Sequence, residues 1–178
     1  MIFFTADLHF NHKNIIQYSN RPYSSVQQME EEIIKNWNKT VSHNDTVYVL
    51  GDFCFGWNSN KIKEVLSKLN GIKHLIVGNH DKVNPHKLSN EWASIEPYKE
   101  INIDNKYLVL SHYPIAEWNG CWYGSIHLYG HCHGKFDLAS ITQNLPHKNT
   151  RCMDVGFDTN NCQLWSWDDI KNKLNIEK

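Results

Sequence analysis

Residues of the kinds that bind metals or move protons follow five apolar runs of the chain, each at the point where the run ends. In chain order they are Asp7 with His9, Asp52, Asn79 with His80 and Asp81, His112, and His131 with His133. Carboxylate, amide and imidazole ligands together suit Mn, Fe or Zn better than Mg, which prefers shells made only of oxygen. A single apolar run that ends at a residue of this kind is common by chance. Five in one chain predict a metal site rather than polar groups satisfied within a core.

The spacing inside two of these clusters supports a shared site. Alternate residues on an extended segment point the same way, so Asp7 and His9 can face one centre, as can His131 and His133. By the same rule Cys132 should face away, and it is left out of the predicted site.

The apolar runs have the length and composition of buried strands, predicted over 2–6, 46–50 and 73–77. A helix capped by Ser24 or Ser25 and another beginning at Ser59 lie between them. Alternation of strand and helix predicts a parallel sheet with covering helices. An open sheet of this kind keeps its chemistry beyond the carboxyl ends of its strands, where these polar residues stand.

The second half of the chain predicts a mainly antiparallel sheet. Its expected strands are 99–103, 107–110, 126–129, 151–155 and 162–166. Residues 135–150 are expected to form a loop, and Ser166 with Asp169 caps a short C-terminal helix. The fold class is therefore α/β, with two packed sheets and helices outside.

Length and composition narrow the class of protein. The 178 residues predict a single domain over 1–178. A net charge of −1 and the lack of a basic run do not indicate binding to extended nucleic acid or to a membrane surface. The start of the chain does not fit a signal peptide, and no apolar stretch is long enough to span a bilayer. Five cysteines without Cys-x-x-Cys spacing favour reduced thiols, and so a cytoplasmic location.

Taken in order, the polar motifs resemble those of the calcineurin-like metallophosphoesterase superfamily, in particular its small cap-less bacterial and phage members. The motifs are Asp7-Leu8-His9, Gly51-Asp52, Gly78-Asn79-His80-Asp81, His112 and Gly130-His131-Cys132-His133. The resemblance covers residues 7 to 133 and implies a β-sandwich of two mixed sheets flanked by helices.

The resemblance also implies a role for each residue. One of two divalent metals would be held by Asp7, His9 and His133. The other would be held by Asn79, His112 and His131. Asp52 would bridge them, and His80 would act as the acid near the leaving group, oriented by Asp81.

These roles predict a phosphoesterase that hydrolyses phosphodiester or nucleotide-type esters by in-line attack of a metal-bridging hydroxide. Two divalent ions outweigh two ligand carboxylates and a hydroxide, which favours an anionic substrate. A phosphomonoesterase or pyrophosphohydrolase is the alternative among enzymes, and a metal-bound interaction module with residual activity is the alternative outside them. The stretch directly after Asp52, Phe53-Cys54-Phe55-Gly56, has no arginine, which disfavours a protein phosphatase, and the presence of His80 disfavours a scaffold.

Substrate recognition would come from loops that begin at ligands, 10–23 and 113–125. Arg21 and Arg151 are the only arginines, and a guanidinium suits phosphate oxygens. Trp118 could stack on a nucleobase. Arg21, Trp118 and Arg151 are therefore the predicted substrate-binding residues.

Overall fold

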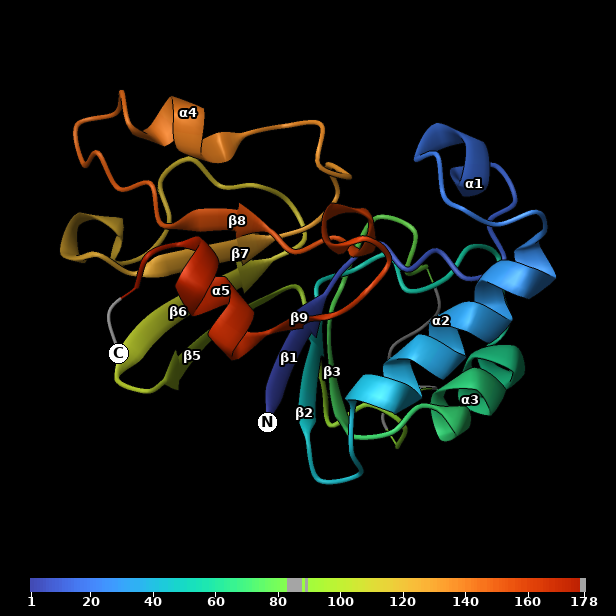
Figure 1. Ribbon diagram of the computed structural model, residues 1–178. Helices are drawn as coiled ribbons and strands as arrows, with labels where there is room; N and C mark the ends of the chain where they lie inside the picture. The colour runs from blue at the N-terminus through green and yellow to red at the C-terminus, as the bar shows by residue number, and fades with distance from the viewer. Residues whose placement is uncertain (83–87, 89, 177–178) are drawn as a thin grey trace.

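The computed structural model describes residues 1–82, 88 and 90–176, which form two β-sheets packed face to face (Figure 1). The first sheet has the strand order β4-β3-β2-β1-β9. Its strands are β1 (Ile2–Thr5), β2 (Thr46–Val49), β3 (Ile72–Ile76), β4 (Ser94–Glu96) and β9 (Trp165–Ser166). The pairings from β1 through β4 are parallel, and β9 is antiparallel to β1. The predicted parallel sheet is confirmed, and β4 and β9 extend it on either side.

Two helices cover the outer face of this sheet, as Figure 1 shows: α2 (Val26–Thr40) and α3 (Ser59–Lys68). The side chain of Ser25 caps α2 by accepting a hydrogen bond from the Gln28 N–H. Met29, Ile33 and Trp37 of α2 are buried in one apolar cluster with the outward-facing side chains of β1 and β2. The predicted stripe therefore packs on the sheet as expected.

The second sheet has the order β5-β6-β7-β8. Its strands are β5 (Tyr98–Ile103), β6 (Lys106–Ser111), β7 (Ile126–Tyr129) and β8 (Cys152–Asp154). The predicted hairpin joins β5 and β6, with Asp104 and Asn105 both at positive φ in its turn. However, β6 pairs with β7 and β7 with β8 in parallel. The prediction of a mainly antiparallel sheet is wrong, because the long segments 112–125 and 130–151 carry the chain back to start the next strand from the same edge.

The core between the sheets draws apolar side chains from both of them and from α5 (Trp167–Lys173). Phe4 of β1, Leu108 of β6 and Ile170 of α5 are all fully buried there. Successive strand residues face opposite ways, so Phe3 points to the helices while Phe4 points into the sandwich. The strands are thus held on both faces, which fixes the position of the loops at their ends.

Two segments predicted as loops contain short helices. Helix α1 (Ile15–Tyr18) buries Ile15, and α4 (Leu138–Thr142) buries Leu138 and Thr142 on the outer side of the second sheet. Asp137 begins α4 by accepting a hydrogen bond from the Ala139 N–H. Both helices are one turn or little more, which is too short for a helical repeat to stand out in the sequence.

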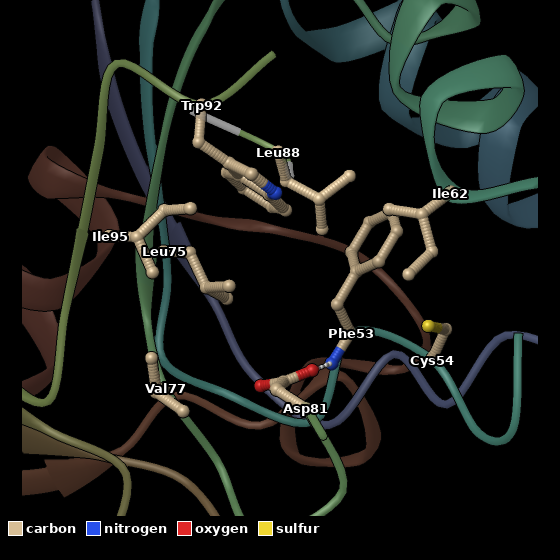
Figure 2. Close-up of a pocket in the computed structure, with 9 residues that line it drawn as sticks. All are labelled: Phe53, Cys54, Ile62, Leu75, Val77, Asp81, Leu88, Trp92 and Ile95. Atoms are coloured by element: carbon tan, nitrogen blue, oxygen red, sulfur yellow. Dashed lines mark hydrogen bonds between the residues drawn. The ribbon is translucent and has the colours of Figure 1, made fainter. Parts of the chain in front are cut away.

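An apolar cavity of about 20 Å³ lies beside α3 and the edge of the first sheet (Figure 2). Phe53, Ile62 and Trp92 contribute to its wall, and the carboxylate of Asp81 lies at one end, bonded to the Phe53 N–H. The turns that carry Asp52 and Asn79 therefore rest against packed apolar side chains.

His127 gives the fold a pH dependence that is separate from the metal-binding residues. Its fully buried ring lies beside the Val109 carbonyl, 3.1 Å from Nδ1, and Nε2 accepts a hydrogen bond from the Ile115 N–H at 3.0 Å. A backbone N–H requires a lone pair at Nε2, so the ring is neutral. Burial lowers the pKa of His127 from 6.5 to about 4.

We expect His127→Gln to lose less stability in acid than the unaltered protein. The unfolded chain takes up a proton at this ring below about pH 6.5, whereas the folded chain resists protonation until about pH 4. Folding free energy is therefore lost as the pH falls through this window, by up to about 3 kcal/mol. Urea unfolding between pH 7 and pH 4 measures the effect. Parallel stability curves for the two proteins would exclude this origin.

Candidate metal centre

The polar residues predicted from the sequence meet at one place, where the carboxyl ends of strands from both sheets come together. Asp7 and His9 follow β1, Asp52 follows β2, and Asn79 follows β3. From the second sheet, His112 follows β6, and His131 and His133 follow β7. Two groups have ligand atoms within 4.8 Å of one another: Asp7, His9 and His133; and Asp52, His112 and His131. The first group is the set that the resemblance implies for one metal. The second contains His112 and His131, which it implies for the other metal, together with Asp52, which it implies as the bridge.

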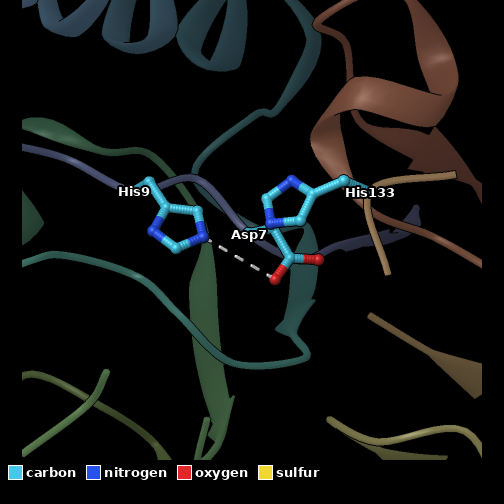
Figure 3. A group of neighbouring side chains, drawn as sticks. All are labelled: Asp7, His9 and His133. Carbon is cyan, nitrogen blue, oxygen red and sulfur yellow. Dashed lines mark ion pairs between the residues drawn. The ribbon is translucent and has the colours of Figure 1, made fainter. Parts of the chain in front are cut away.

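In the first group the side chains turn toward a common centre (Figure 3). Asp7 Oδ1 lies 4.0 Å from His9 Nε2, and both residues are almost fully buried. Neither atom has a hydrogen-bond partner among the residues that the structure describes. Burial raises the pKa of Asp7 well above its usual range and lowers that of His9 to about 2. Two buried ligand atoms that face each other without a hydrogen-bond partner fit a divalent cation between them.

Asp52 lies between the two groups. Its Oδ2 atom is 3.6 Å from His9 Nε2 and 3.6 Å from His112 Nε2. Its Oδ1 atom accepts a hydrogen bond from the His80 N–H at 2.8 Å. One carboxylate oxygen thus reaches the imidazole of each group, which is the geometry a bridging ligand needs.

In the second group, too, side-chain atoms that could bind a metal point toward one another. His112 Nδ1 lies 2.8 Å from the Leu50 carbonyl, which can only accept, so this nitrogen carries the proton. The lone pair of His112 Nε2 then faces Asp52 Oδ2 and, at 3.0 Å, Asn79 Oδ1. His112 Nε2, Asp52 Oδ2 and Asn79 Oδ1 therefore converge. The hydrogen bond to the Leu50 carbonyl fixes the His112 ring, as is usual for the second nitrogen of a metal-binding histidine.

The backbone of the centre is strained. Asp7, His9, Asp52, His131 and His133 all have φ between 50° and 70°, a region that side chains other than glycine rarely adopt. Such conformations persist where the surrounding structure enforces them, and they cluster at functional sites. Asp7 and His9 lie in one ligand group, whereas His131 and His133 lie in different groups. The extended segment assumed for both pairs is wrong. Left-handed turns direct these side chains, and Cys132 packs against the outer apolar cluster.

Glycines in the motifs leave room for the ligands. A Cβ on Gly51, whose φ is +89°, would lie 2.3 Å from His112 Nδ1. A Cβ on Gly130 would lie 2.4 Å from Ala6 Cβ and 2.9 Å from Asp7 Oδ2. Side chains at these positions would displace ligands.

His80 stands at the rim. Its Nε2 atom is 3.9 Å from Asp52 Oδ2, and its side chain is 31% exposed. The predicted orientation of this ring by Asp81 is wrong. The Asp81 carboxylate instead accepts hydrogen bonds from the backbone N–H groups of Gly78, Asp52 and Phe53, at 2.8, 2.8 and 2.9 Å. Burial raises the pKa of Asp81 to about 6. Asp81 therefore ties the turn that carries Asp52 to the turn that carries Asn79.

Arg21 does not face a substrate. Its side chain has no exposed surface. Nε and Nη2 donate to both carboxylate oxygens of Asp158, Nη1 donates to the Leu8 carbonyl, and Nη2 donates to the Asp7 carbonyl. Asp158 Oδ2 in turn lies 2.7 Å from His133 Nδ1. Direct phosphate binding by Arg21 is thus contradicted, because its donors are used inside the protein, where they fix the strained Asp7 segment and the His133 ring.

Asp154 and Asp158 hold the candidate centre in place, although the sequence did not predict either of them. Asp154 accepts hydrogen bonds from the N–H groups of Gly134 and Gly156, at 2.9 and 2.7 Å, and so holds the turn after His133. The predicted strand 151–155 placed Asp154 inside it, whereas the observed β8 ends at Asp154, so this residue lies at a strand end as the predicted ligands do.

The other predicted substrate-binding residues lie elsewhere. Trp118 is only 3% exposed, packs with its ring centroid 5.3 Å from that of His127, and donates from Nε1 to Ser125 Oγ. It is a core residue, so stacking on a nucleobase is contradicted. Arg151 precedes β8, at the edge of the second sheet opposite the ligands, and donates to the Gly124 carbonyl.

Among the described residues, no helix is both long and apolar enough to cross a membrane.

Comparison with known proteins agrees with this geometry. The family model described as calcineurin-like phosphoesterase matches residues 1–173. An uncharacterized protein of Methanocaldococcus jannaschii is 38% identical over 133 residues, which are 74% of this chain and 69% of that protein. The gene 66 protein of Mycobacterium phage L5 is 28% identical over 200 residues, covering 97% of this chain and 93% of its own. A solved structure of a protein of unknown function from Aquifex aeolicus aligns with a TM-score of 0.74 and 26% identity, covering 97% and 98% of the two chains. The sequence resemblance and the fold prediction are confirmed, and the chain belongs to the calcineurin-like phosphoesterase family.

Proposed function

We propose that this protein hydrolyses phosphodiester or nucleotide-type phosphate esters with the aid of two divalent metal ions. The observation that carries the proposal is the position of Asp52 Oδ2, which lies 3.6 Å from one imidazole of each ligand group. The family match supports a hydrolase of phosphate esters. Two bound ions would supply positive charge that binds phosphate oxygens and activates the attacking water.

Each metal ion would have its own set of ligands. Asp7, His9 and His133 would hold one ion, Asn79, His112 and His131 the other, with Asp52 shared. The mixed oxygen and nitrogen donors favour Mn, Fe or Zn. We also propose that 1–178 is one domain, supported by a centre that draws ligands from both sheets. A cytoplasmic location is supported by the five free thiols.

His80 is the residue we assign to the leaving group. It borders the centre, and its backbone N–H is fixed by Asp52 Oδ1. A protonated imidazole at this position can give its proton to the departing oxygen, and such a step contributes roughly 10²–10⁴-fold to a rate. His80 also remains accessible, so solvent can return the proton after each turnover.

We expect His80→Ala to retain its metals but to slow esters with alkoxide leaving groups by roughly 10²–10⁴-fold. An activated aryl diester, whose leaving group scarcely needs a proton, should be slowed far less. Rates on a dialkyl and a p-nitrophenyl diester, with metal content measured on the same samples, make the comparison. Equal losses on both esters, or a lost metal, would remove the assigned role.

The substrate class can be tested directly. A metal-supplemented screen should include phosphomonoesters, linear and cyclic phosphodiesters, and nucleotides. The proposal predicts that diesters or nucleotides are turned over fastest. If simple monoesters are hydrolysed fastest, the protein is a phosphomonoesterase instead. If no ester is hydrolysed, the proposed function is refuted.

A further inference from the structure

A cleft opens beside His80 that the metal-binding residues do not use. It has a volume of about 350 Å³, within the range of small-molecule sites. It is lined by Cys54, Phe55, Gly56, Trp57, His80 and Lys82. Most of these residues lie on the loop that follows Asp52, and the others follow Asn79. The cleft is thus built on the same two turns that carry the centre.

Phe55 forms a fixed but exposed platform at this cleft. Its backbone N–H donates to the Phe10 carbonyl at 2.8 Å, and its carbonyl accepts from Asn11 Nδ2 at 2.9 Å. Its ring stacks on His12 with centroids 4.5 Å apart and planes 14° from parallel. Even so, 42% of the residue is exposed. An aromatic ring held on one side and open to solvent offers a face for a ligand at little entropic cost.

The Phe55 ring lies beside His80, which in turn lies beside the candidate metal ligand His9. The Phe55 and His80 ring centroids are 5.2 Å apart, and those of His80 and His9 are 5.4 Å apart. Trp57 supplies a second, half-buried aromatic side chain, stacked on Phe10 with centroids 5.5 Å apart. Both aromatic walls therefore lie on the His80 side of the centre.

We propose that this cleft binds the leaving group of the substrate and selects a planar aromatic one stacked on Phe55. The inference rests on the proposed function, in which His80 protonates the leaving oxygen. The substituent on that oxygen must then lie beside His80, where the cleft opens. Aryl alcohols and nucleosides share the required chemistry, because each presents a π-face.

Three diesters test the selectivity. Methyl p-nitrophenyl phosphate has an aryl leaving group, and 2′,3′-cyclic AMP has a nucleoside one. Ethylene phosphate has the same strained five-membered ring as the cyclic nucleotide but no aromatic group. Phe55→Ala should raise KM about tenfold for the aromatic substrates and less than twofold for ethylene phosphate. Phe55→Tyr keeps an aromatic face and should raise KM for the aromatic substrates much less than Phe55→Ala does. Tyr123→Ala, at a residue that is 94% exposed, controls for loss of a surface aromatic side chain.

A binding measurement separates this inference from the proposed function. Saturation-transfer NMR with adenosine needs no metal and no turnover. Transfer to the base protons should be clear with the unaltered protein and at least severalfold weaker with Phe55→Leu, which retains an apolar side chain to support folding. Adenosine binding without hydrolysis of any ester would overturn the proposed function and leave the cleft assignment standing. Equal KM changes for all three esters, or transfer that is unchanged in Phe55→Leu or absent from the unaltered protein, would overturn the cleft assignment.

Discussion

Replacing Arg21 by alanine is expected to lower the free energy of unfolding by about 3–5 kcal/mol, the cost of leaving a buried charge without its partner. The change removes both hydrogen bonds to Asp158 and the donors to the Leu8 and Asp7 carbonyls. It also frees the carboxylate that holds His133, so metal affinity at this group should fall about 10- to 100-fold. Denaturant unfolding and metal titration measure the two effects.

The second arginine of the chain is a matched control for the first. Arg151 is exposed, and among the described residues its side chain makes one hydrogen bond, from Nη1 to the Gly124 carbonyl. Arg151→Ala should change stability by about 0.5 kcal/mol or less and leave metal binding unaltered. Arg21→Lys keeps the charge but not the planar fork, and it should recover only part of the loss. If Arg21→Ala were as stable as Arg151→Ala, the buried network would have no role in holding the site.

Replacing Asp52 by asparagine is expected to reduce the stability that the protein gains from metal. Asp52 and Asp7 are close enough that the charge of Asp52 contributes to the raised pKa of Asp7. Without metal, removing this charge should therefore stabilise the folded chain or leave it unchanged. With metal, the variant should lose the shared ligand, bind fewer ions and gain less stability from them. Turnover should fall by roughly 10²–10³-fold, the scale of a lost preorganised electrostatic group.

Thermal unfolding with and without Mn²⁺ measures this difference. Asparagine suits the comparison because its amide oxygen can still accept the hydrogen bond from the His80 N–H. Asp168→Asn removes a carboxylate that is 70% exposed, and its response to metal should match that of the unaltered protein. An Asp52→Asn variant that binds two ions with unchanged turnover would show that Asp52 is not a shared ligand.

The parts of the site that could be predicted from the sequence are those encoded locally. Each ligand follows an apolar run, and parallel strands bring their carboxyl ends to one edge, so Asp7, Asp52 and Asn79 had to lie near one another. His112 and His131 also lie at one edge because β6 and β7 are parallel. The sequence pattern predicted a mainly antiparallel second sheet, however, so the proximity of these two residues could not be predicted in this way. The role predicted for each residue came from the family resemblance, and spacing alone did not divide the ligands into two groups.

The parts that could not be predicted depend on contacts between distant segments. Arg21 meets Asp158 across 137 positions of sequence, and no local pattern indicates that pair. Trp118 lies on a loop anchored near the centre at both ends, but the loop folds onto the outer face of the second sheet, where Trp118 joins a buried cluster. Loop anchors are predictable from the strands, whereas the burial of side chains within the loop is set by tertiary packing.

Metal content and activity measured on the same sample test the central claim most directly. The protein would be loaded with Mn²⁺, freed of unbound ion and subjected to elemental analysis. Its hydrolysis of methyl p-nitrophenyl phosphate would then be followed before chelation, after chelation and after Mn²⁺ is restored. We predict two ions per chain, loss of activity with the chelator and recovery with the metal. One ion or none per chain, with no activity restored by Mn²⁺, would contradict a two-metal phosphoesterase.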